Sequence, residues 1–256
     1  GTAFKITQYA DDTTLILQGE KSIQSCFQLI HDYERASGAK INKSKCEGLW
    51  LGNFKSRTDN PFNLTWGRKS LKILGVFHGP QNYEKETWDP RITKFIKTLD
   101  LWSTRDLTLR GRAVVVNQLA ASVFWYTATV YPIPQWALKK VNERLWKFVY
   151  QNKKDPIKRT QAKLPYELGG LNIVDIQKKC EALKLSWICK LLDEESQGKW
   201  KTLFHYYFDQ YKDFSIGSAI FKCYLRATEM KHCPNFYKDV VKCFAQNFSD
   251  LRVQPT

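Results

Sequence analysis

The sequence Phe4-Lys5-Ile6-Thr7-Gln8-Tyr9-Ala10-Asp11-Asp12-Thr13-Thr14-Leu15-Ile16-Leu17 contains two β-prone runs on either side of a short polar connection. It predicts a β-hairpin with Ala10-Asp11-Asp12 at the tip. Two adjacent carboxylates on a tight turn form a concentrated negative site, and Mg²⁺ prefers carboxylate oxygens. Such a pair suits two-metal nucleotidyl transfer, in which one ion activates the attacking oxygen and the other stabilises the leaving oxygen. Asp is also favoured in turns for structural reasons, so the hairpin alone leaves both roles open.

Helical and extended patterns continue beyond the hairpin. Ile23, Phe27 and Ile30 share one face of an expected helix that ends at Gly38. Short strands are expected at three further places, which are residues 48–51, 62–66 and 71–77. After about residue 85 the pattern becomes helical, and helices are expected at residues 89–101, 108–130, 135–150 and 175–192.

The later helices carry both terminal signals and apolar faces. Thr108 and Asp175 stand where N-caps are expected. One apolar face consists of Leu138, Val141, Leu145 and Phe148. The fold class is therefore predicted to be α+β, with a small antiparallel part in residues 1–85. Two mainly α-helical regions follow, residues 86–152 and residues 153–256. The second of them begins with a basic linker, and its helices beyond residue 195 are only vaguely defined.

The charge balance of the chain is strongly positive. Its 256 residues include 40 Lys and Arg against 25 Asp and Glu, which gives a net charge of +15. With 43% apolar residues, the chain is not composed like a disordered polymer. A positive balance favours a polyanionic partner, because neutralising phosphates releases condensed counterions. A basic surface without such a partner, or an anionic membrane surface, is also compatible with the charge.

Two further features limit the function classes. Residues 113–138 have no charged side chain, but Asn117, Pro132 and other polar or helix-breaking residues interrupt them, so a buried core helix ending at Tyr131-Pro132 is expected rather than a membrane span. Seven scattered cysteines without CxxC spacing predict reduced, partly buried thiols. A zinc site is a weaker alternative, because its candidate ligands fit no familiar spacing; they are Cys223, His232, Cys233 and Cys243.

Three motifs in a fixed order resemble the palm of reverse transcriptases. Tyr9-Ala10-Asp11-Asp12 is similar to the Tyr/Phe-x-Asp-Asp motif of that family. The stretch Ser37-Gly38-Ala39-Lys40-Ile41-Asn42-Lys43-Ser44-Lys45 resembles the Gly-x-Lys-x-Asn-x-x-Lys segment that follows the catalytic hairpin. Lys72-Ile73-Leu74-Gly75-Val76 resembles the Lys-Tyr-Leu-Gly-Ile primer-grip strand and departs from it at Ile73. Each motif is weak by itself, but their order makes the resemblance specific.

Downstream motifs narrow the resemblance to non-LTR (LINE-type) retrotransposons. Leu107-Thr108-Leu109-Arg110-Gly111-Arg112, followed by Asn117, resembles the start of the long thumb helix of those enzymes. Phe148-Val149-Tyr150 with Lys153-Lys154 resembles the end of the next helix and its basic connection, and residues 164–173 are similar to their Gly-Gly-Leu segment. The resemblance covers roughly residues 4–192.

The resemblance implies a role for each palm residue. Asp11 would be a catalytic Mg²⁺ ligand, Asp12 a second acidic neighbour with a weaker role, and Tyr9 a support near the primer end. Leu74 and Gly75 would lie on a strand that positions the primer's 3′ terminus. The implied cofactor is Mg²⁺, and the implied partners are an RNA template, a DNA primer and deoxynucleoside triphosphates.

Basic residues are implied to contact nucleic acid or triphosphate. Lys45 matches the motif lysine, and either Lys45 or Lys43 would approach the triphosphate or pyrophosphate, with proton donation as one possible role; a solvated loop lysine is the favoured alternative. Arg110 and Arg112 would follow the phosphates of an RNA–DNA hybrid, which gives affinity without reading sequence. Tryptophans are expected in the core or at interfaces rather than as stacking platforms, although single-stranded RNA binding through exposed aromatics stays open; these are Trp66, Trp88, Trp102, Trp125, Trp136 and Trp146.

The resemblance also implies that part of the active site is missing. A further catalytic carboxylate and the fingers would precede Gly1, which is not an initiator Met, so the chain is expected to be a fragment of an RNA-directed DNA polymerase that is inactive alone. The alternatives are a non-catalytic nucleic-acid-binding remnant of a decayed retroelement and an unrelated basic helical scaffold. The family logic implies an intracellular protein of nucleus and cytoplasm, with no membrane partner.

Overall fold

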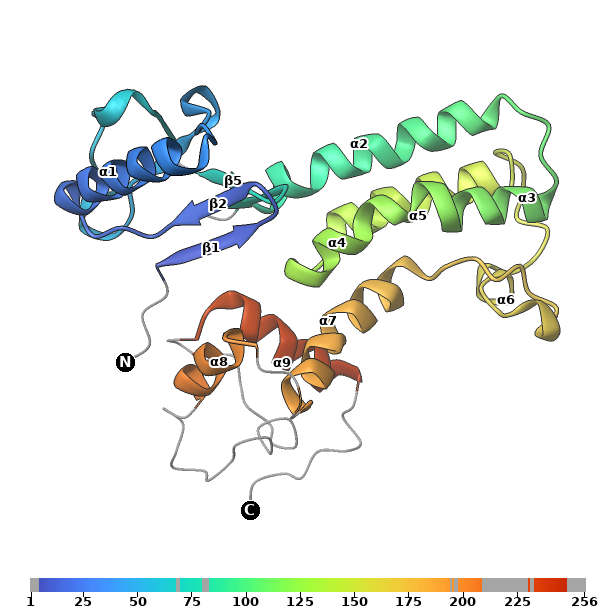
Figure 1. Ribbon diagram of the computed structural model, residues 1–256. Coiled ribbons are helices and arrows are strands. Elements are labelled where there is room, and N and C mark those ends of the chain that lie inside the picture. The colour runs from blue at the N-terminus through green and yellow to red at the C-terminus, as the bar shows by residue number, and fades with distance from the viewer. Residues whose placement is uncertain are drawn as a thin grey trace, which may run out of the picture. The chain divides into compact units, whose positions relative to one another are not determined.

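The computed structural model describes residues 5–67, 70–79, 83–193, 195, 198–208, 230 and 233–247. Contacts between residues divide the chain into two compact units, Gly1–Thr87 and Trp88–Thr256. Short strands and one long helix make up the first unit, and helices make up the second (Figure 1). This arrangement confirms the predicted α+β class with a mainly helical C-terminal region.

The first unit begins with the predicted hairpin. Strands β1 (Ile6–Tyr9) and β2 (Asp12–Leu15) pair antiparallel, with Ile6 opposite Leu15 and Tyr9 opposite Asp12. Helix α1 (Glu20–Ser37) follows and ends at Gly38, which adopts the left-handed conformation at φ 74° that glycine tolerates best. The hairpin and the end of this helix were both predicted from the sequence.

The remaining strands of the first unit form two separate pairs. Strand β3 (Glu47–Leu49) pairs with β4 (Thr65–Gly67) in parallel, so the expectation of a purely antiparallel sheet was wrong for this pair. Strands β5 (Leu71–Ile73) and β6 (Val76–His78) form a second antiparallel hairpin. The single strand expected over residues 71–77 is therefore folded back on itself.

A stack of aromatic rings and one guanidinium holds the irregular part of the first unit together. The rings of Trp50 and Trp66 lie 4.0 Å apart and 8° from parallel, and the Arg57 guanidinium lies 4.4 Å from the Trp50 ring. Arg57 also pairs with Glu20 at the start of α1 and with Asp59. Through the ion pair between Arg57 and Glu20, the segment between β3 and β4 contacts the start of α1.

The second unit is built from helices of unequal length. The long ones are α2 (Glu84–Ser103), α5 (Gln135–Val149) and α7 (Ile176–Leu192). The shorter ones are α3 (Leu109–Val114), α4 (Ser122–Val130), α6 (Arg159–Ala162), α8 (Trp200–Phe208) and α9 (Asn235–Asn247). Helix α2 begins earlier than expected and contains Pro90, which lacks the N–H that would continue the helical hydrogen bonds.

The expected long helix over residues 108–130 is interrupted. Its N-cap was predicted correctly, because the Thr108 hydroxyl accepts a hydrogen bond from the Gly111 N–H at 3.1 Å. A π-helical segment, Val115–Ala120, then separates α3 from α4, and the two parts meet at 44°. Among the described residues, no single helix is long and apolar enough to cross a membrane, although this bent pair reaches that length and apolarity when taken together.

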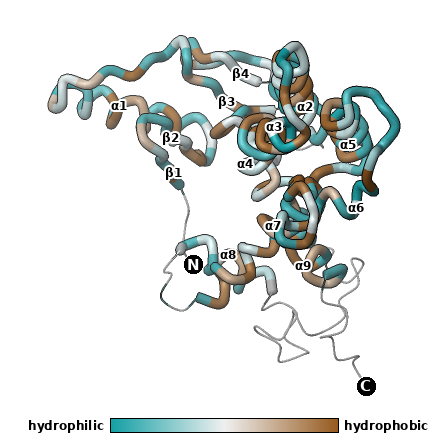
Figure 2. Tube along the Cα trace, turned by 90° about the vertical axis from the view of Figure 1, so that its right-hand side faces the viewer, coloured by the Kyte–Doolittle hydropathy of each residue, from teal (hydrophilic) through white to brown (hydrophobic). Residues whose placement is uncertain are grey.

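Among the described residues of the second unit, most buried apolar side chains form one continuous core. Trp88 and Phe95 of α2 pack around Phe124 of α4, and their rings lie 6.1 and 5.1 Å from the Phe124 ring. The predicted face of α5 is buried in this core, as are Ala162, Leu171 and Ile173. Figure 2 shows apolar residues alternating with hydrophilic ones along these helices. The segment expected to be a basic linker is thus partly folded onto the core.

A second, smaller core lies toward the C-terminus and was not predicted. It joins Ile188 of α7, Phe204 of α8 and Val240 of α9, and Trp187 packs against it. Helix α7 therefore serves both cores, and its N-cap Asp175 accepts a hydrogen bond from the Lys178 N–H at 3.2 Å as expected. Of the possible zinc ligands, Cys223 and His232 lie outside the described residues.

Candidate functional site

The Asp11-Asp12 turn is a tight two-residue connection. Because Tyr9 pairs with Asp12, only Ala10 and Asp11 lie between the strands. Ala10 has φ 51°, a conformation that residues other than glycine rarely adopt, and its carbonyl accepts a hydrogen bond from the Gln8 amide at 3.3 Å. A two-residue hairpin connection requires a positive φ at its first position, so the Ala10 conformation follows from the tightness of the turn. The turn holds Asp11 and Asp12 next to each other at the tip.

The carboxylates of this turn could take part in a metal site but do not complete one alone. Asp11 and Asp12 are both exposed. Magnesium keeps several waters and commonly uses one or two protein carboxylates together with substrate phosphates, so the donor types fit. Among the described residues, however, no group of three His, Cys, Asp or Glu side chains gathers to hold a metal.

The hairpin is mostly exposed: every residue of β1 is exposed, whereas Thr14 and Leu15 at the end of β2 are half-buried. Tyr9 is 69% exposed, Ile6 is 61% exposed and Ile16, just after β2, is 59% exposed. Two-stranded hairpins are only marginally stable in water without a surface to cover their apolar side chains. No described residue buries Tyr9, and its support of the primer end stays a prediction.

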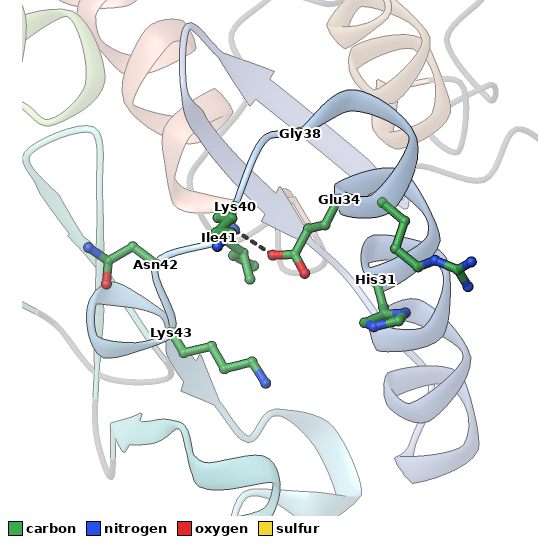
Figure 3. Close-up of a pocket in the computed structure, with 8 residues that line it drawn as sticks. His31, Glu34, Gly38, Lys40, Ile41, Asn42 and Lys43 are labelled. Carbon is green, nitrogen blue, oxygen red and sulfur yellow. Dashed lines mark hydrogen bonds between the residues drawn. The ribbon is translucent and has the colours of Figure 1, made fainter.

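The first candidate lysine lines a broad depression beside α1. The loop after Gly38 runs back along the helix because the Ile41 N–H donates to the Glu34 carboxylate at 2.7 Å (Figure 3). The depression has a volume of about 830 Å³. Its lining residues are His31, Glu34, Arg35, Gly38, Lys40, Ile41, Asn42 and Lys43. Arg35, Lys40 and Lys43 outnumber the one carboxylate, so the depression is electropositive.

Lys43 and Lys45 are placed differently by a short 3-10 turn. Lys43 extends into the depression (Figure 3), whereas Lys45 is exposed and is not among the lining residues. Among the described residues, no hydrogen bond or ion pair joins either lysine to Asp11 or Asp12. Arg35 and Lys40 are additional cations of this site, and the Glu34–Ile41 contact that assembles them spans seven residues.

Leu74 and Gly75 occupy a turn rather than the expected strand. Both have positive φ, 47° and 80°, and they connect the paired residues Ile73 and Val76. A two-residue hairpin connection requires such angles, which only Gly75 adopts readily. Leu74 is strained and 40% exposed at the tip. The expected placement on a strand was wrong, although the primer-positioning role itself stays a prediction.

The two arginines at the start of α3 have different surroundings. Arg112 donates hydrogen bonds to the Leu107 carbonyl and, at 3.1 Å, to the Val149 carbonyl at the end of α5. A cation is favourable at a helix C-terminus, so Arg112 stabilises the junction of α3 and α5. Arg110 is exposed and lies 5.5 Å from the ring of Tyr166. We therefore keep Arg110 as a candidate nucleic-acid contact and assign Arg112 a structural role.

Asn117 explains why two distant motifs occur together. Its amide donates to the Asn172 carbonyl at 2.7 Å and accepts from the Val174 N–H at 3.0 Å. These two bonds join the π-helical segment to the stretch after Gly169-Gly170. Hydrogen bonds between residues 55 and 57 positions apart leave no local sequence signal.

The basic connection after α5 contains both paired and unpaired cations. Arg159 pairs with Asp155 at 2.7 Å, and Lys163 pairs with Asp175 at 2.7 Å. Lys153, Lys154 and Lys158 are exposed and form no ion pair with any described residue. These three lysines can neutralise phosphates without first breaking an internal contact.

The described cysteines are unpaired thiols, as predicted. Cys26, Cys46, Cys180, Cys189, Cys233 and Cys243 are free. Burial raises the pKa of Cys180 to about 12 and those of Cys233 and Cys243 to about 11. These three thiols stay protonated at neutral pH and are poor nucleophiles.

Comparison with known proteins connects these features to mobile elements. No protein-family model matches the chain. Over 249 residues, 94% of its length, it is 27% identical to the Xenopus laevis protein "Transposon TX1 uncharacterized 149 kDa protein". The chain resembles a transposon protein. It spans 19% of the length of that relative, and the likeness supports a transposon origin for the chain.

Proposed function

We propose that the chain is part of an RNA-directed DNA polymerase of a non-LTR retrotransposon. The observation that carries the proposal is the tight turn that displays Asp11 beside Asp12, with Ala10 at positive φ. The similarity to a transposon protein and the order of the three palm-like motifs support it. Because the chain spans about a fifth of its relative, the activity is proposed for the parent protein and not for this segment alone.

Each candidate residue has its own role in the proposed nucleotidyl transfer. Asp11 and Asp12 hold Mg²⁺ together with a carboxylate from another part of the parent protein. When bound, Mg²⁺ lowers the cost of charge on the attacking and leaving oxygens. Tyr9 supports the primer end near the carboxylates, and Leu74-Gly75 contacts the primer from the tip of its hairpin. Lys43, on the electropositive depression, is better placed than Lys45 to attract a triphosphate or pyrophosphate.

The proposal is tested by primer extension with the parent protein, an RNA template and Mg²⁺. Asp11→Asn is expected to lower the extension rate by at least about a thousandfold, because it removes a charged ligand from the reacting centre. Asp32→Asn is the matched control, since Asp32 is an exposed carboxylate on α1 of the same unit. Full activity of the Asp11→Asn protein would falsify the catalytic assignment.

The unpaired lysines favour a second candidate function, nucleic-acid binding without catalysis. Lys153, Lys154 and Lys158 stand in a chain of net charge +15 and form no ion pair with the rest of the described chain. Each phosphate contact contributes about −0.9 to the slope of log K against log salt concentration. Changing all three lysines to Gln is therefore expected to make this slope less negative by about two to three units. Fluorescence anisotropy with an RNA–DNA hybrid measures this slope. A slope that does not change removes these lysines from the interface.

A further inference from the structure

We propose that Tyr166 is a stacking platform for an unpaired base of single-stranded RNA. Tyr166 lies in the Gly-Gly-Leu segment, residues 164–173. The proposed function uses the carboxylates, the depression and the basic residues, and it assigns no role to this segment. The choice of RNA rests on the proposed function, because an RNA-templated polymerase must hold template that is not yet paired.

The loop that carries Tyr166 is rigid. Residues 166–168 form a 3-10 turn, and Gly169 ends it at φ 74°. The Leu168 carbonyl accepts a hydrogen bond from the Gln161 amide at 2.9 Å, and the Gly170 N–H donates to the Pro165 carbonyl at 3.0 Å. A Cβ on Gly170 would lie 1.8 Å from the Leu164 carbonyl oxygen, so only glycine fits there. The backbone around the tyrosine is therefore held in one conformation.

The tyrosine ring is presented to solvent by this rigid loop. Tyr166 is 41% exposed and Leu168 is 63% exposed, whereas Leu171 and Ile173 just beyond are buried in the core. The exposed part of the ring forgoes the free energy of burial, and it is available to a ligand. The conformational cost of fixing an aromatic residue for binding is already met in the folded chain.

Arg110 gives the surface around Tyr166 its charge. The Arg110 guanidinium lies 5.5 Å from the Tyr166 ring, within the range of a cation–π interaction, and remains exposed. Arg110 belongs to α3, whose neighbour Arg112 contacts the end of α5, from which Lys153 and Lys154 follow directly. An aromatic ring, an arginine and unpaired lysines are the components by which proteins bind single strands: the ring stacks a base and the cations hold the backbone.

The charge and the ring together favour RNA over a protein partner. An acidic peptide would use the cations but would gain little from a tyrosine face, whereas every nucleobase has a π-face that can stack on it. Single-stranded RNA is commonly bound through splayed bases on aromatic and arginine planes. A paired hybrid offers no free base face except at its ends, so Tyr166 should distinguish single strands from duplexes.

The test compares tyrosine variants of the full chain for binding to a fluorescein-labelled 12-nucleotide RNA. Tyr166→Ala is expected to weaken binding about tenfold, since one stacked base contributes that order of affinity. Tyr166→Phe retains the ring and is expected to bind within twofold of the original chain. Tyr33→Ala is the matched control, because Tyr33 is 64% exposed on α1 and remote in sequence from the basic segment.

Two readouts separate stacking from a merely structural effect. With 2-aminopurine in the RNA, binding should quench its fluorescence in the original chain and in Tyr166→Phe, but much less in Tyr166→Ala. Affinity for a blunt RNA–DNA hybrid should differ less than twofold between the original chain and each of the two Tyr166 variants. Equal loss in Tyr166→Phe and Tyr166→Ala, equal loss for hybrid and single strand, or no loss overturns the platform. None of these outcomes depends on Asp11, so the polymerase proposal is judged separately by primer extension.

Discussion

The two units differ in how much of their stability comes from their own residues. In the described part of the first unit, the buried apolar side chains are Ile23, Trp50 and Val76. In the second unit, one continuous core extends from Trp88 in α2 to Cys180 in α7. Burial of apolar surface is the main favourable contribution to folding, so the helical unit is far better stabilised by its own packing.

The contrast between the two units indicates where the chain depends on further contacts. The unit with the carboxylates has exposed Ile6, Tyr9 and Ile16 on and beside its hairpin, and its strands form three separate pairs. Strand pairs of this length need another surface for independent stability. We infer that the Asp11-Asp12 turn gains its order from contacts beyond its own unit, whereas the helices are already ordered by their own packing.

Truncating one phenylalanine in each unit tests this contrast with the largest expected effect. Phe124 is fully buried between Trp88 and Phe95, so Phe124→Ala should lower the free energy of unfolding by about 3–5 kcal/mol. Phe27 is half-buried against Phe62, with rings 5.8 Å apart, and Phe27→Ala should cost about 1 kcal/mol.

Hydrogen exchange measured by mass spectrometry assigns each loss to its unit. Phe124→Ala should accelerate exchange across α2 to α7, and Phe27→Ala should accelerate exchange in α1 while leaving those helices unchanged. Urea unfolding followed by circular dichroism gives the two free energies. Similar costs for both variants would contradict the contrast, because they would mean that the first unit packs as firmly as the second.

Local signals predicted much of the fold. The caps at Thr108 and Asp175, the left-handed Gly38 and the buried face of α5 were predicted from residues within one or two turns of each other. Such features depend on side chains bonding to neighbouring backbone groups, or on periodic burial, so the sequence contains them directly. The hairpin around Asp11 belongs to the same class.

Features set by distant residues were not predicted. Arg112 was expected at a phosphate, but its partner Val149 lies 37 positions away. The π-helical segment within residues 108–130 contains Asn117, whose partners are 55 and 57 positions away. The second core joins α7 to α8 and α9 without a local signal in the sequence. Leu74 is a related case, because its positive φ follows from the pairing of β5 with β6 and not from its own preference.

The candidate site shows the same division between features with local sequence signals and features set by later contacts. The position of Asp11 at a hairpin tip follows from two β-prone runs around a polar turn, so residue type and order were enough. The depression around Lys43 was not foreseen, because it exists only after Glu34 binds the Ile41 N–H and turns the loop back along α1. Trp136 was expected in the core or at an interface, and its 40% exposure excludes the core.

Lys184 joins the two cores of the helical unit. Lys184 lies on α7 one turn after Cys180 of the first core and one turn before Ile188 of the second, and it is 2% exposed. Its ammonium donates to the Val130 carbonyl at 2.7 Å and lies 4.3 Å from the Phe236 ring. Burial lowers the pKa of Lys184 to about 8, although Asp239 and the Cys243 thiol on α9 act in the opposite direction.

The lowered pKa makes stability depend on pH in a definite direction. Between pH 8 and the unfolded value near 10.5, the unfolded chain binds more protons than the folded chain, so stability should rise with pH. Above pH 9 the raised pKa values of the Cys180 and Cys243 thiols oppose this rise, which leaves pH 8 to 9 as the useful window. There the gain in the free energy of unfolding should be at most about 1 kcal/mol.

Urea unfolding at pH 7, 8 and 9 measures this gain. Lys184→Met is expected to remove the rise in stability. Lys179 is an exposed lysine on the same helix, so Lys179→Met is expected to retain the rise. If Lys184→Met keeps the rise, water reaches the ammonium and the second core packs on the first more loosely than the structure indicates.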